Sequence, residues 1–306
     1  MHELIDKTIN QVGTILLGKD QQIRLALTCL FSGGHLLIED LPGMGKTTLA
    51  HTLARVLGLS FNRVQFTSDL LPADILGVSI FDKQTQQFNF HPGPVFNQVI
   101  LADEINRATP KSQSALLEAM EEGQVTVEGE SRPLPTPFFV IATQNPDTQA
   151  GTFPLPESQL DRFLMKIELG YPDPAAERTL MKGEDRRDVL ARLGASLNAR
   201  QLAEIQDQCR QVKVSDALLD YVQRLVQFTR DSKEFAYGLS PRGALALLGC
   251  AKTWAYIERR NHVVPEDVQA VLGPIVEHRL REAADFSGHG GGALAQRLLT
   301  QVDVIG

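Results

Sequence analysis

The stretch from Asp40 to Thr47, with the sequence Asp-Leu-Pro-Gly-Met-Gly-Lys-Thr, has the residue types of a phosphate-binding loop. A loop between a strand and a helix points its backbone N–H groups at one place, and the helix N-terminus adds positive character there. Gly43 and Gly45 permit a close backbone approach. Lys46 can reach the β- and γ-phosphates, and the Thr47 hydroxyl can ligate Mg²⁺. A purely structural Gly-rich turn is the alternative.

Asp40 departs from the usual loop pattern GxxxxGK[ST], in which the first position is glycine. A carboxylate this close to bound phosphates would repel them unless its side chain pointed away, and the sequence leaves the role of Asp40 open.

Two carboxylates, Asp103 and Glu104, end the apolar run that starts at Val99. A phosphate-loop site needs a carboxylate near Mg²⁺ and a group that orients the attacking water. Asp103 suits the first role and Glu104 the second. Taken alone, the pair could equally end a strand and cap the next helix. Its position after a phosphate-binding loop favours the catalytic interpretation.

A polar amide, Asn145, follows the apolar run that starts at Phe138 and precedes a proline. An amide at a strand end can hydrogen-bond the γ-phosphate or the attacking water. A plain Asn-Pro turn is the simpler interpretation of this motif by itself.

Two arginines, Arg162 and Arg242, lie in the motifs Leu-Asp-Arg-Phe and Leu-Ser-Pro-Arg-Gly. An arginine from a neighbouring subunit can accelerate phosphoryl transfer by roughly 10³–10⁵ in studied enzymes. An arginine on a mobile second domain can respond to the bound nucleotide. For each arginine alone, a surface ion pair is the simpler interpretation.

Short apolar runs bounded by turn residues predict the strands that must position these groups. Five such runs are His35–Glu39, Phe61–Phe66, Val99–Asp103, Phe138–Thr143 and Leu164–Leu169. Helical stretches are expected before the first run, from Leu4 to Leu30 with a break at Gly18, and at Gly45–Leu57, Pro110–Glu122 and Glu157–Asp161. Buried strands that alternate with helices predict a parallel sheet covered on both faces.

Two β-hairpins interrupt this alternation, and the pattern changes after residue 170. The hairpin arms are Leu76–Phe81 with Gln86–Phe90, and Gln124–Glu128 with Ser131–Pro135. From Tyr171 onward strand patterns stop. Helical periods follow at Ala199–Gln211, Ser215–Arg230, Pro241–Glu258 and Pro265–Glu277, with Ser215, Ser240 and Pro265 at starting positions. We therefore divide the chain into an α/β domain, 1–170, and a helical domain, 171–306.

The composition excludes several classes of protein. The chain has 306 residues, a net charge of -7 and 43% apolar residues, which is typical of a globular protein. No apolar run approaches the roughly 18 residues that span a membrane, and the acidic start is unlike a signal peptide. The three cysteines form no CxxC pair and the histidines show no metal-ligand spacing. We expect a cytoplasmic protein, with SGHGGG at 287–292 as a connector.

The ordered motifs together resemble an AAA+ ATPase, and in detail the MoxR branch of that family. The segments that carry the resemblance are EDLPGMGKT, PADILG, FNFHPGPVF, LADEINRATPKSQSALLEAMEE, ATQNP, GTFPLPESQLDRF and LSPRGALAL. They extend over about residues 5–280. An aspartate at position 40 is common in this branch.

The resemblance implies a fold and a set of site residues. The fold is a P-loop α/β domain with a five-stranded parallel sheet of order 5-1-4-3-2, β-hairpin insertions and a C-terminal helical lid. Glu104, Asn145 and Arg162 would be catalytic, with Arg162 acting on the neighbouring subunit's site, and Thr47 and Asp103 would hold Mg²⁺. ATP would be contacted by Pro42, Gly43, Met44, Gly45, Lys46, Thr47, Thr48 and Arg242. Arg107 and Lys111 could also face a neighbour.

The resemblance also implies a function. It is Mg²⁺-dependent ATP hydrolysis by a ring, expected to be hexameric, that drives chaperone-like remodelling or assembly of partner proteins. Proteins with von Willebrand factor type A domains are common partners in this family. The alternatives are a nucleic-acid motor, which the acidic balance disfavours, a chelatase-type subunit, and a nucleotide switch without turnover.

Overall fold

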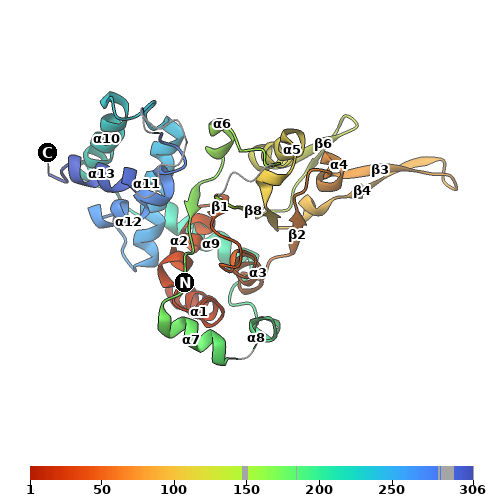
Figure 1. The fold of residues 1–306 in the computed structure, drawn as a ribbon, viewed down its shortest axis with the longest axis horizontal. Helices are drawn as coiled ribbons and strands as arrows, with labels where there is room; N and C mark the ends of the chain where they lie inside the picture. Colours follow the sequence, from red (N-terminus) through yellow and green to blue (C-terminus); the bar gives the residue numbers. More distant parts are fainter. Residues whose placement is uncertain (147–150, 184, 282, 284–292, 306) are drawn as a thin grey trace.

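A five-stranded parallel sheet lies at the centre of the computed structural model, which describes residues 1–146, 151–183, 185–281, 283 and 293–305 (Figure 1). Its strand order is β2-β5-β8-β1-β9. The bounds are β1 Leu36–Glu39, β2 Phe61–Gln65, β5 Val99–Asp103, β8 Phe139–Gln144 and β9 Met165–Ile167. Numbered among themselves and read from β9, these strands have the predicted order 5-1-4-3-2, which the structure therefore confirms.

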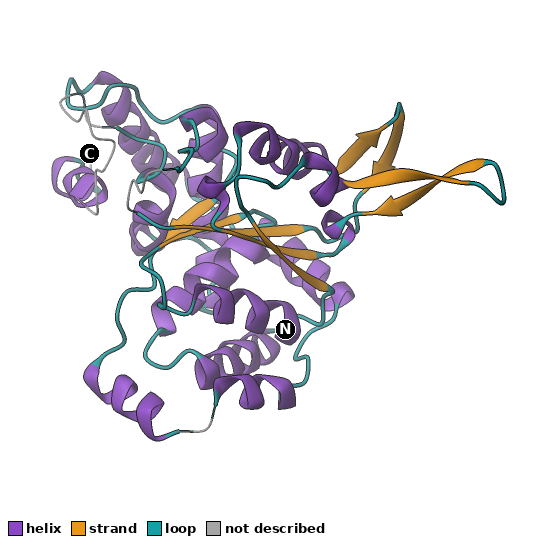
Figure 2. Ribbon diagram, turned by 45° about the vertical axis from the view of Figure 1, so that its right-hand side comes forward, coloured by secondary structure: helices purple, strands orange, loops and turns teal. Residues whose placement is uncertain are grey.

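Helices cover both faces of the sheet because side chains along each strand alternate between two cores (Figure 2). Leu36 and Ile38 of β1 belong to the larger core, whereas Leu37 belongs to the smaller one. The larger core includes residues of helices α1 His2–Ile15, α2 Asp20–Phe31 and α3 Lys46–Val56. The smaller core includes residues of α4 Pro72–Leu76 and α5 Pro110–Glu122.

The register of the strands brings their carboxyl ends into one row. Glu39 of β1 is opposite Gln144 of β8, and Gln65 of β2 is opposite Asp103 of β5. β5 and β8 are themselves paired, with Ala102 opposite Ala142. The residues that follow these strands therefore start from the same edge of the sheet.

Both predicted hairpins are present and confirmed. The first consists of β3 Gly77–Asp82 and β4 Gln87–Pro92, and it projects away from the sheet (Figure 1). The second consists of β6 Gln124–Val127 and β7 Glu130–Pro133. The two hairpins meet where the Arg132 guanidinium lies 4.1 Å from the centre of the Phe90 ring. Two 3₁₀ turns, Pro94–Phe96 and Ile105–Arg107, flank β5.

All the strands of the described residues precede residue 168, and helices follow. They are α7 Pro174–Lys182, α8 Arg186–Arg192, α9 Ala199–Arg210, α10 Asp216–Asp231, α11 Pro241–Ile257, α12 Pro265–Val276 and α13 Ala293–Gln301. Ser215 and Ser240 cap α10 and α11 by accepting hydrogen bonds from Leu218 N–H and Gly243 N–H. The expected connector at 287–292 lies outside the described residues.

Sequence patterns missed four helices. The segment after Tyr171 was interpreted only as the boundary between the halves, but α7 starts there because Asp173 caps it and Pro174 occupies its first position. Helices α4, α8 and α13 were also not predicted. The division at residue 171 stays a prediction, since the larger core includes residues on both sides of it. None of the described helices combines the length and apolar character needed to cross a membrane.

The partly buried His35, just before β1, is fixed by two backbone groups. Its Nδ1 accepts from Val140 N–H at 3.0 Å, and its Nε2 lies 3.3 Å from Met120 C=O, as suits a neutral ring protonated at Nε2. Burial lowers the pKa of His35 to about 4, against a smaller raising effect from the Met120 carbonyl. The unfolded chain, with a His pKa of about 6.5, therefore binds the proton first as the pH falls.

We expect the free energy of unfolding to fall as the pH drops from 7 to 5, with His35 responsible for about 1–2 kcal/mol of that loss. In His35→Gln, which retains a donor and an acceptor but cannot titrate, the loss should be smaller by this amount. Urea unfolding at both pH values measures it, with the exposed His262→Gln as control. An unchanged pH dependence in His35→Gln would contradict the assignment.

Candidate functional site

The loop between β1 and α3 has the backbone geometry of an anion site. Gly43 has φ 85° and Gly45 has φ 93°, in the left-handed region that side chains disfavour. No side chain caps α3. The first backbone bond into the helix runs from Leu49 N–H to Gly45 C=O at 2.9 Å. The N–H groups of residues 46–48 precede that bond and are available to a ligand.

Lys46 connects this loop to the end of β8. Its ammonium donates to Asn145 Oδ1 at 2.7 Å, to the Gln144 carbonyl at 3.3 Å and to the Asp40 carbonyl. Burial lowers the pKa of Lys46, while nearby carboxylates, first that of Asp40 and then that of Asp103, act in the opposite direction. The side chain is thus a buried cation at the centre of the site, held by neutral acceptors that an anionic ligand could replace.

The Asp40 carboxylate points away from the loop. Its Oδ2 accepts from the N–H groups of Leu169 and Gly170 at 2.7 and 2.6 Å, and its Oδ1 accepts from Leu41 N–H at 2.7 Å. Its charge is therefore directed at amides beyond the end of β9. Through these hydrogen bonds, Asp40 connects the loop of residues 40–47 to the segment that leads into the helical half.

Asp103 and Thr47 are brought together beside Lys46. Asp103 Oδ2 is 3.4 Å from the Thr47 hydroxyl and also accepts from the Arg63 guanidinium at 2.6 Å. Its Oδ1 accepts from the Thr143 hydroxyl at 2.5 Å. A carboxylate and a hydroxyl are hard oxygen donors that fit Mg²⁺, which completes its shell with phosphates and water. Arg63 shares the oxygen that such an ion would use.

Glu104 follows in a left-handed backbone conformation, with φ 55°. Its N–H donates to the Thr143 hydroxyl at 2.9 Å. Its carboxylate accepts from Arg107 at 2.8 Å, from Gln65 at 3.0 Å and from the Asn145 amide at 3.4 Å. Because Asn145 also contacts the Lys46 ammonium, one amide joins the cation of the loop to the carboxylate that follows β5.

The two arginines singled out in the sequence lie elsewhere. Arg162 pairs with Glu121 of α5 at 3.0 Å, and Arg242 pairs with the same carboxylate at 2.8 Å and with Asp161 at 3.8 Å. The hydrogen bond from Arg242 and the charge of Arg162 lower the pKa of Glu121. Lys111 is exposed on α5.

Sequence reasoning did not single out Thr143, Gln65 or Arg63. Thr143 accepts from the Glu104 N–H and donates to the Asp103 carboxylate. Gln65 donates to the Glu104 carboxylate, and Arg63 donates to the Asp103 carboxylate. Each lies within the last three residues of a strand at the carboxyl edge. Polar residues at the ends of adjacent strands would have been the signal, once the strand order was known.

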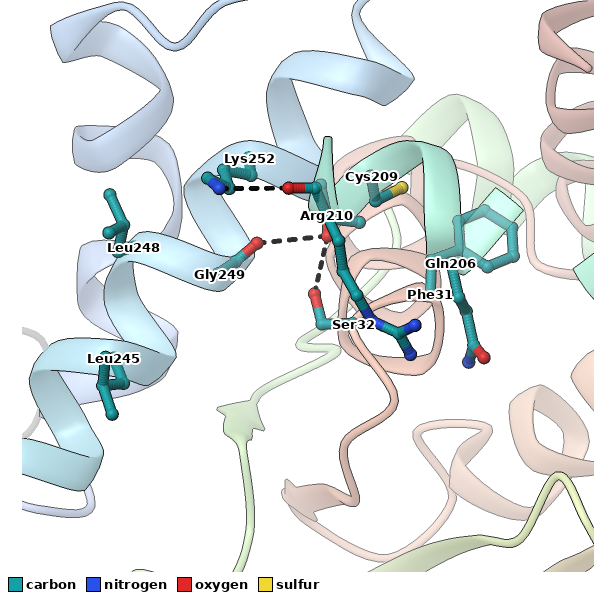
Figure 3. A pocket seen from close by; sticks show the side chains of 10 residues that line it. Phe31, Ser32, Gln206, Cys209, Arg210, Leu245, Leu248, Gly249 and Lys252 are labelled. Atoms are coloured by element: carbon teal, nitrogen blue, oxygen red, sulfur yellow. Dashed lines mark hydrogen bonds between the residues drawn. The ribbon is translucent and has the colours of Figure 1, made fainter. Parts of the chain in front are cut away.

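A hollow of about 240 Å³ lies between α2, α9 and α11, apart from this site (Figure 3). Its wall includes Phe31, Arg210 and Leu245 but no residue of the 40–48 loop. Lys252 on this wall donates to the Arg210 carbonyl at 3.1 Å. Among the described residues, no group of three or more His, Cys, Asp or Glu side chains could hold a metal ion.

Comparison with protein families gives two matches. Residues 35–165 match the model of the ATPase family associated with various cellular activities (AAA), and residues 227–298 match an AAA lid domain. The first match contains the loop, both carboxylates, Asn145 and Arg162. The second contains Arg242.

Individual relatives extend the similarity over most of the chain. An uncharacterised Bacillus subtilis protein, YeaC, is 40% identical over 99% of this chain and 96% of its own. Chaperone MoxR1 of Mycobacterium tuberculosis is 40% identical over 90% of this chain and 75% of its own. Protein MoxR of Paracoccus denitrificans is 32% identical over 87% of this chain and 85% of its own. A crystal structure assigned to an ATPase of Cytophaga hutchinsonii has a TM-score of 0.88 and 37% sequence identity. The match covers 99% of this chain and 95% of that one.

Replacing Lys46 by alanine should abolish ATP binding, because the loop loses the cation that faces the phosphates. Loss of a buried charged partner costs about 2–5 kcal/mol, which is at least about thirtyfold in affinity. Titration calorimetry with ATP measures the change, and Lys83→Ala at the hairpin tip is the control. Tight ATP binding by Lys46→Ala would remove the assignment of this loop.

Replacing Glu104 by glutamine should leave ATP binding intact and lower turnover by roughly 10²–10⁴, the usual contribution of a general base. The amide can still accept from Gln65 and Arg107 but cannot take a proton from water. Steady-state phosphate release measures the effect, with Glu118→Gln on the exposed face of α5 as control. Near-normal turnover would assign the role to another group.

Proposed function

Since the chain belongs to the MoxR family of AAA+ ATPases, we propose that it couples Mg²⁺-dependent ATP hydrolysis in a ring to chaperone-like remodelling or assembly of partner proteins. The observation that carries the proposal is the convergence of Lys46, Thr47, Asp103, Glu104 and Asn145 at one edge of the sheet. The loop supplies positive charge and N–H groups, while the adjacent strands supply acceptors on the opposite side.

Each side chain has a role in this proposal. Lys46 and the N–H groups at the start of α3 bind the β- and γ-phosphates. Thr47 and Asp103 would hold Mg²⁺, which supplies charge neutralisation on the phosphate oxygens when bound. Glu104 takes the proton of the attacking water, and Asn145 orients that water or the γ-phosphate. Arg63 must share or yield the Asp103 oxygen when the cation binds.

Glu104 offers the attacking water one of its two oxygens. Its Oε2 accepts from both Arg107 and Gln65. Its Oε1 accepts at 3.4 Å from the Asn145 amide, the group that would orient the water in this proposal.

The placement of Arg162 supports the ring in this proposal. In its own chain this side chain pairs with Glu121 rather than with the site residues. A head-to-tail contact that closes by rotation would present it to a neighbour's site, and six subunits is the number the family leads us to expect. Arg242, on the first turn of α11, would reach the phosphates of its own site when the helical half moves.

The surface of the first hairpin favours protein clients. It exposes Ile80, Phe81 and Phe88, whose side chains are 51%, 48% and 67% accessible. Apolar exposed residues suit contact with a protein chain. Binding to nucleic acid needs a basic footprint, but Arg132 of the second hairpin is engaged by Phe90 and Glu130. One relative is named a chaperone, and partners with von Willebrand factor type A domains remain part of this proposal.

Mixing two inactive variants tests the ring. Arg162→Ala subunits keep their own site but lack the arginine for a neighbour, while Lys46→Ala subunits lack the site but keep the arginine. We expect mixed rings to regain part of the wild-type ATPase rate, although each variant alone is inactive. Phosphate release measures the rate, and native mass spectrometry shows that the rings are mixed.

The control mixture is Arg162→Ala with Arg162→Ala,Lys46→Ala subunits, which supply neither a site nor an arginine. This mixture should stay inactive. Proven mixed rings of the two single variants that also stay inactive would contradict an arginine acting between subunits.

A further inference from the structure

Arg279, just beyond the end of α12, has a buried guanidinium whose five N–H donors all find acceptors. Its side chain is 4% exposed. Nε donates to the Asp161 carboxylate at 2.7 Å, and Nη2 donates to the carbonyls of Phe163 and Asp161 at 2.7 and 3.3 Å. Nη1 donates to the carbonyls of Ile275 and Leu164 at 2.7 and 3.1 Å. An arginine has five such donors, so none is left over.

Four of these five bonds end on one turn, residues 161–164, between α6 Glu157–Leu160 and β9. That turn carries Arg162. The neighbouring His278 adds a contact from its Nε2 to the Phe163 carbonyl at 3.0 Å. The end of α12 therefore fixes the backbone on both sides of the arginine that the proposed ring presents to its neighbour.

Arg279 also lies against the helix start that carries Arg242. A Cβ atom added to Gly243 would be 3.2 Å from Arg279 Cδ, so the arginine stem passes directly beneath this turn of α11. Asp161, which Arg279 holds, is itself 3.8 Å from Arg242. The start of α11, the end of α12 and the 161–164 turn therefore form one connected cluster.

A buried arginine is an unusual way to gain stability alone. Moving a guanidinium out of water costs several kcal/mol, and well-packed apolar residues often serve as well. What the guanidinium adds is a rigid planar fork that fixes the direction of several carbonyls at once. This favours a role in orientation.

We propose that Arg279 is a positioning residue that couples the Arg162 turn to helices α11 and α12. Movement of the helical half of one subunit, in response to its own nucleotide, then moves the arginine that it presents to the next subunit. The inference rests on the proposed function, because it requires that Arg162 act in a neighbouring site. It adds the element of the same chain that controls this action.

The test uses full-length Arg279→Gln subunits, alone and mixed with Lys46→Ala subunits. Alone, the variant should bind ATP as the wild type does, and its turnover should fall roughly ten- to thousandfold, part of the contribution of an arginine finger. Mixed with Lys46→Ala, it should regain turnover as the Arg162→Ala mixture does, since the partner supplies a correctly held Arg162. A residue that served only its own site or its own folding would show no such recovery.

Two further variants make the outcome decisive. Arg279→Lys keeps the charge but not the fork, so it should fold, lose turnover and recover on mixing, even if Arg279→Gln does not fold. Arg260→Gln removes another lid arginine, paired with the buried Asp267 of α12, and any loss it causes should not recover on mixing.

Normal turnover by Arg279→Lys, or no recovery in either Arg279 mixture while the Arg162→Ala mixture recovers, would overturn the role of Arg279 and leave the proposed function standing. Failure of the Arg162→Ala mixture itself would overturn the action between subunits on which both proposals rest.

Discussion

The site depends on one constraint, the alignment of the carboxyl ends of β1, β5 and β8. Only this register lets the Lys46 ammonium reach Asn145 while the Asn145 amide reaches Glu104. Asp103 and Thr47 meet for the same reason, because the loop after β1 and the end of β5 occupy one edge. A slip of one residue would turn every side chain of a strand to the opposite face. The two apolar cores that fix the register thereby fix the chemistry as well.

Residue types and spacing were sufficient to predict that Lys46, Thr47, Asp103 and Glu104 lie together, because few other roles explain a Gly-rich loop followed by two carboxylates after a buried strand. Their roles toward a nucleotide stay predictions. The strand order itself came from the family resemblance. Thr143 and Arg63 could not be found, since their function depends on which strands are neighbours, and a single sequence does not show pairing. The hydrogen bonds of Asp40 to Leu169 and Gly170 were hidden for the same reason.

The helices that were missed have a local explanation. α7 begins with Asp173 and Pro174, a pair that suits a turn as well as a helix start, and it buries Ala176 as its principal apolar residue. With so little apolar periodicity, the segment resembles a linker. α4, Pro72–Leu76, is too short to show a period at all. By contrast α10, with buried residues regularly spaced from Leu218 to Thr229, was predicted almost to its ends.

The two kinds of arginine contact differ in how readily they can be exchanged. Arg162 and Arg242 share the part-exposed Glu121. Exposed ion pairs of this kind contribute little to stability, so the proposed transfer of either arginine to a phosphate would cost little. Arg279 is the opposite case, buried and fully bonded. The chain thus combines two exchangeable arginine contacts on Glu121 with one fixed arginine contact, that of Arg279.

The continuity of the larger core has a mechanical consequence. It extends without interruption from β1 and α2 to α11 and α12. A hinge opening of the helical half would break this core. Motion between the halves must be a shear, in which packed helices slide by a small distance while their side chains change rotamers. The hollow bordered by α2, α9 and α11 lies at this sliding joint and leaves room for the displaced side chains. Relative motion of the two halves is therefore limited to small displacements, set by how far packed helices can slide.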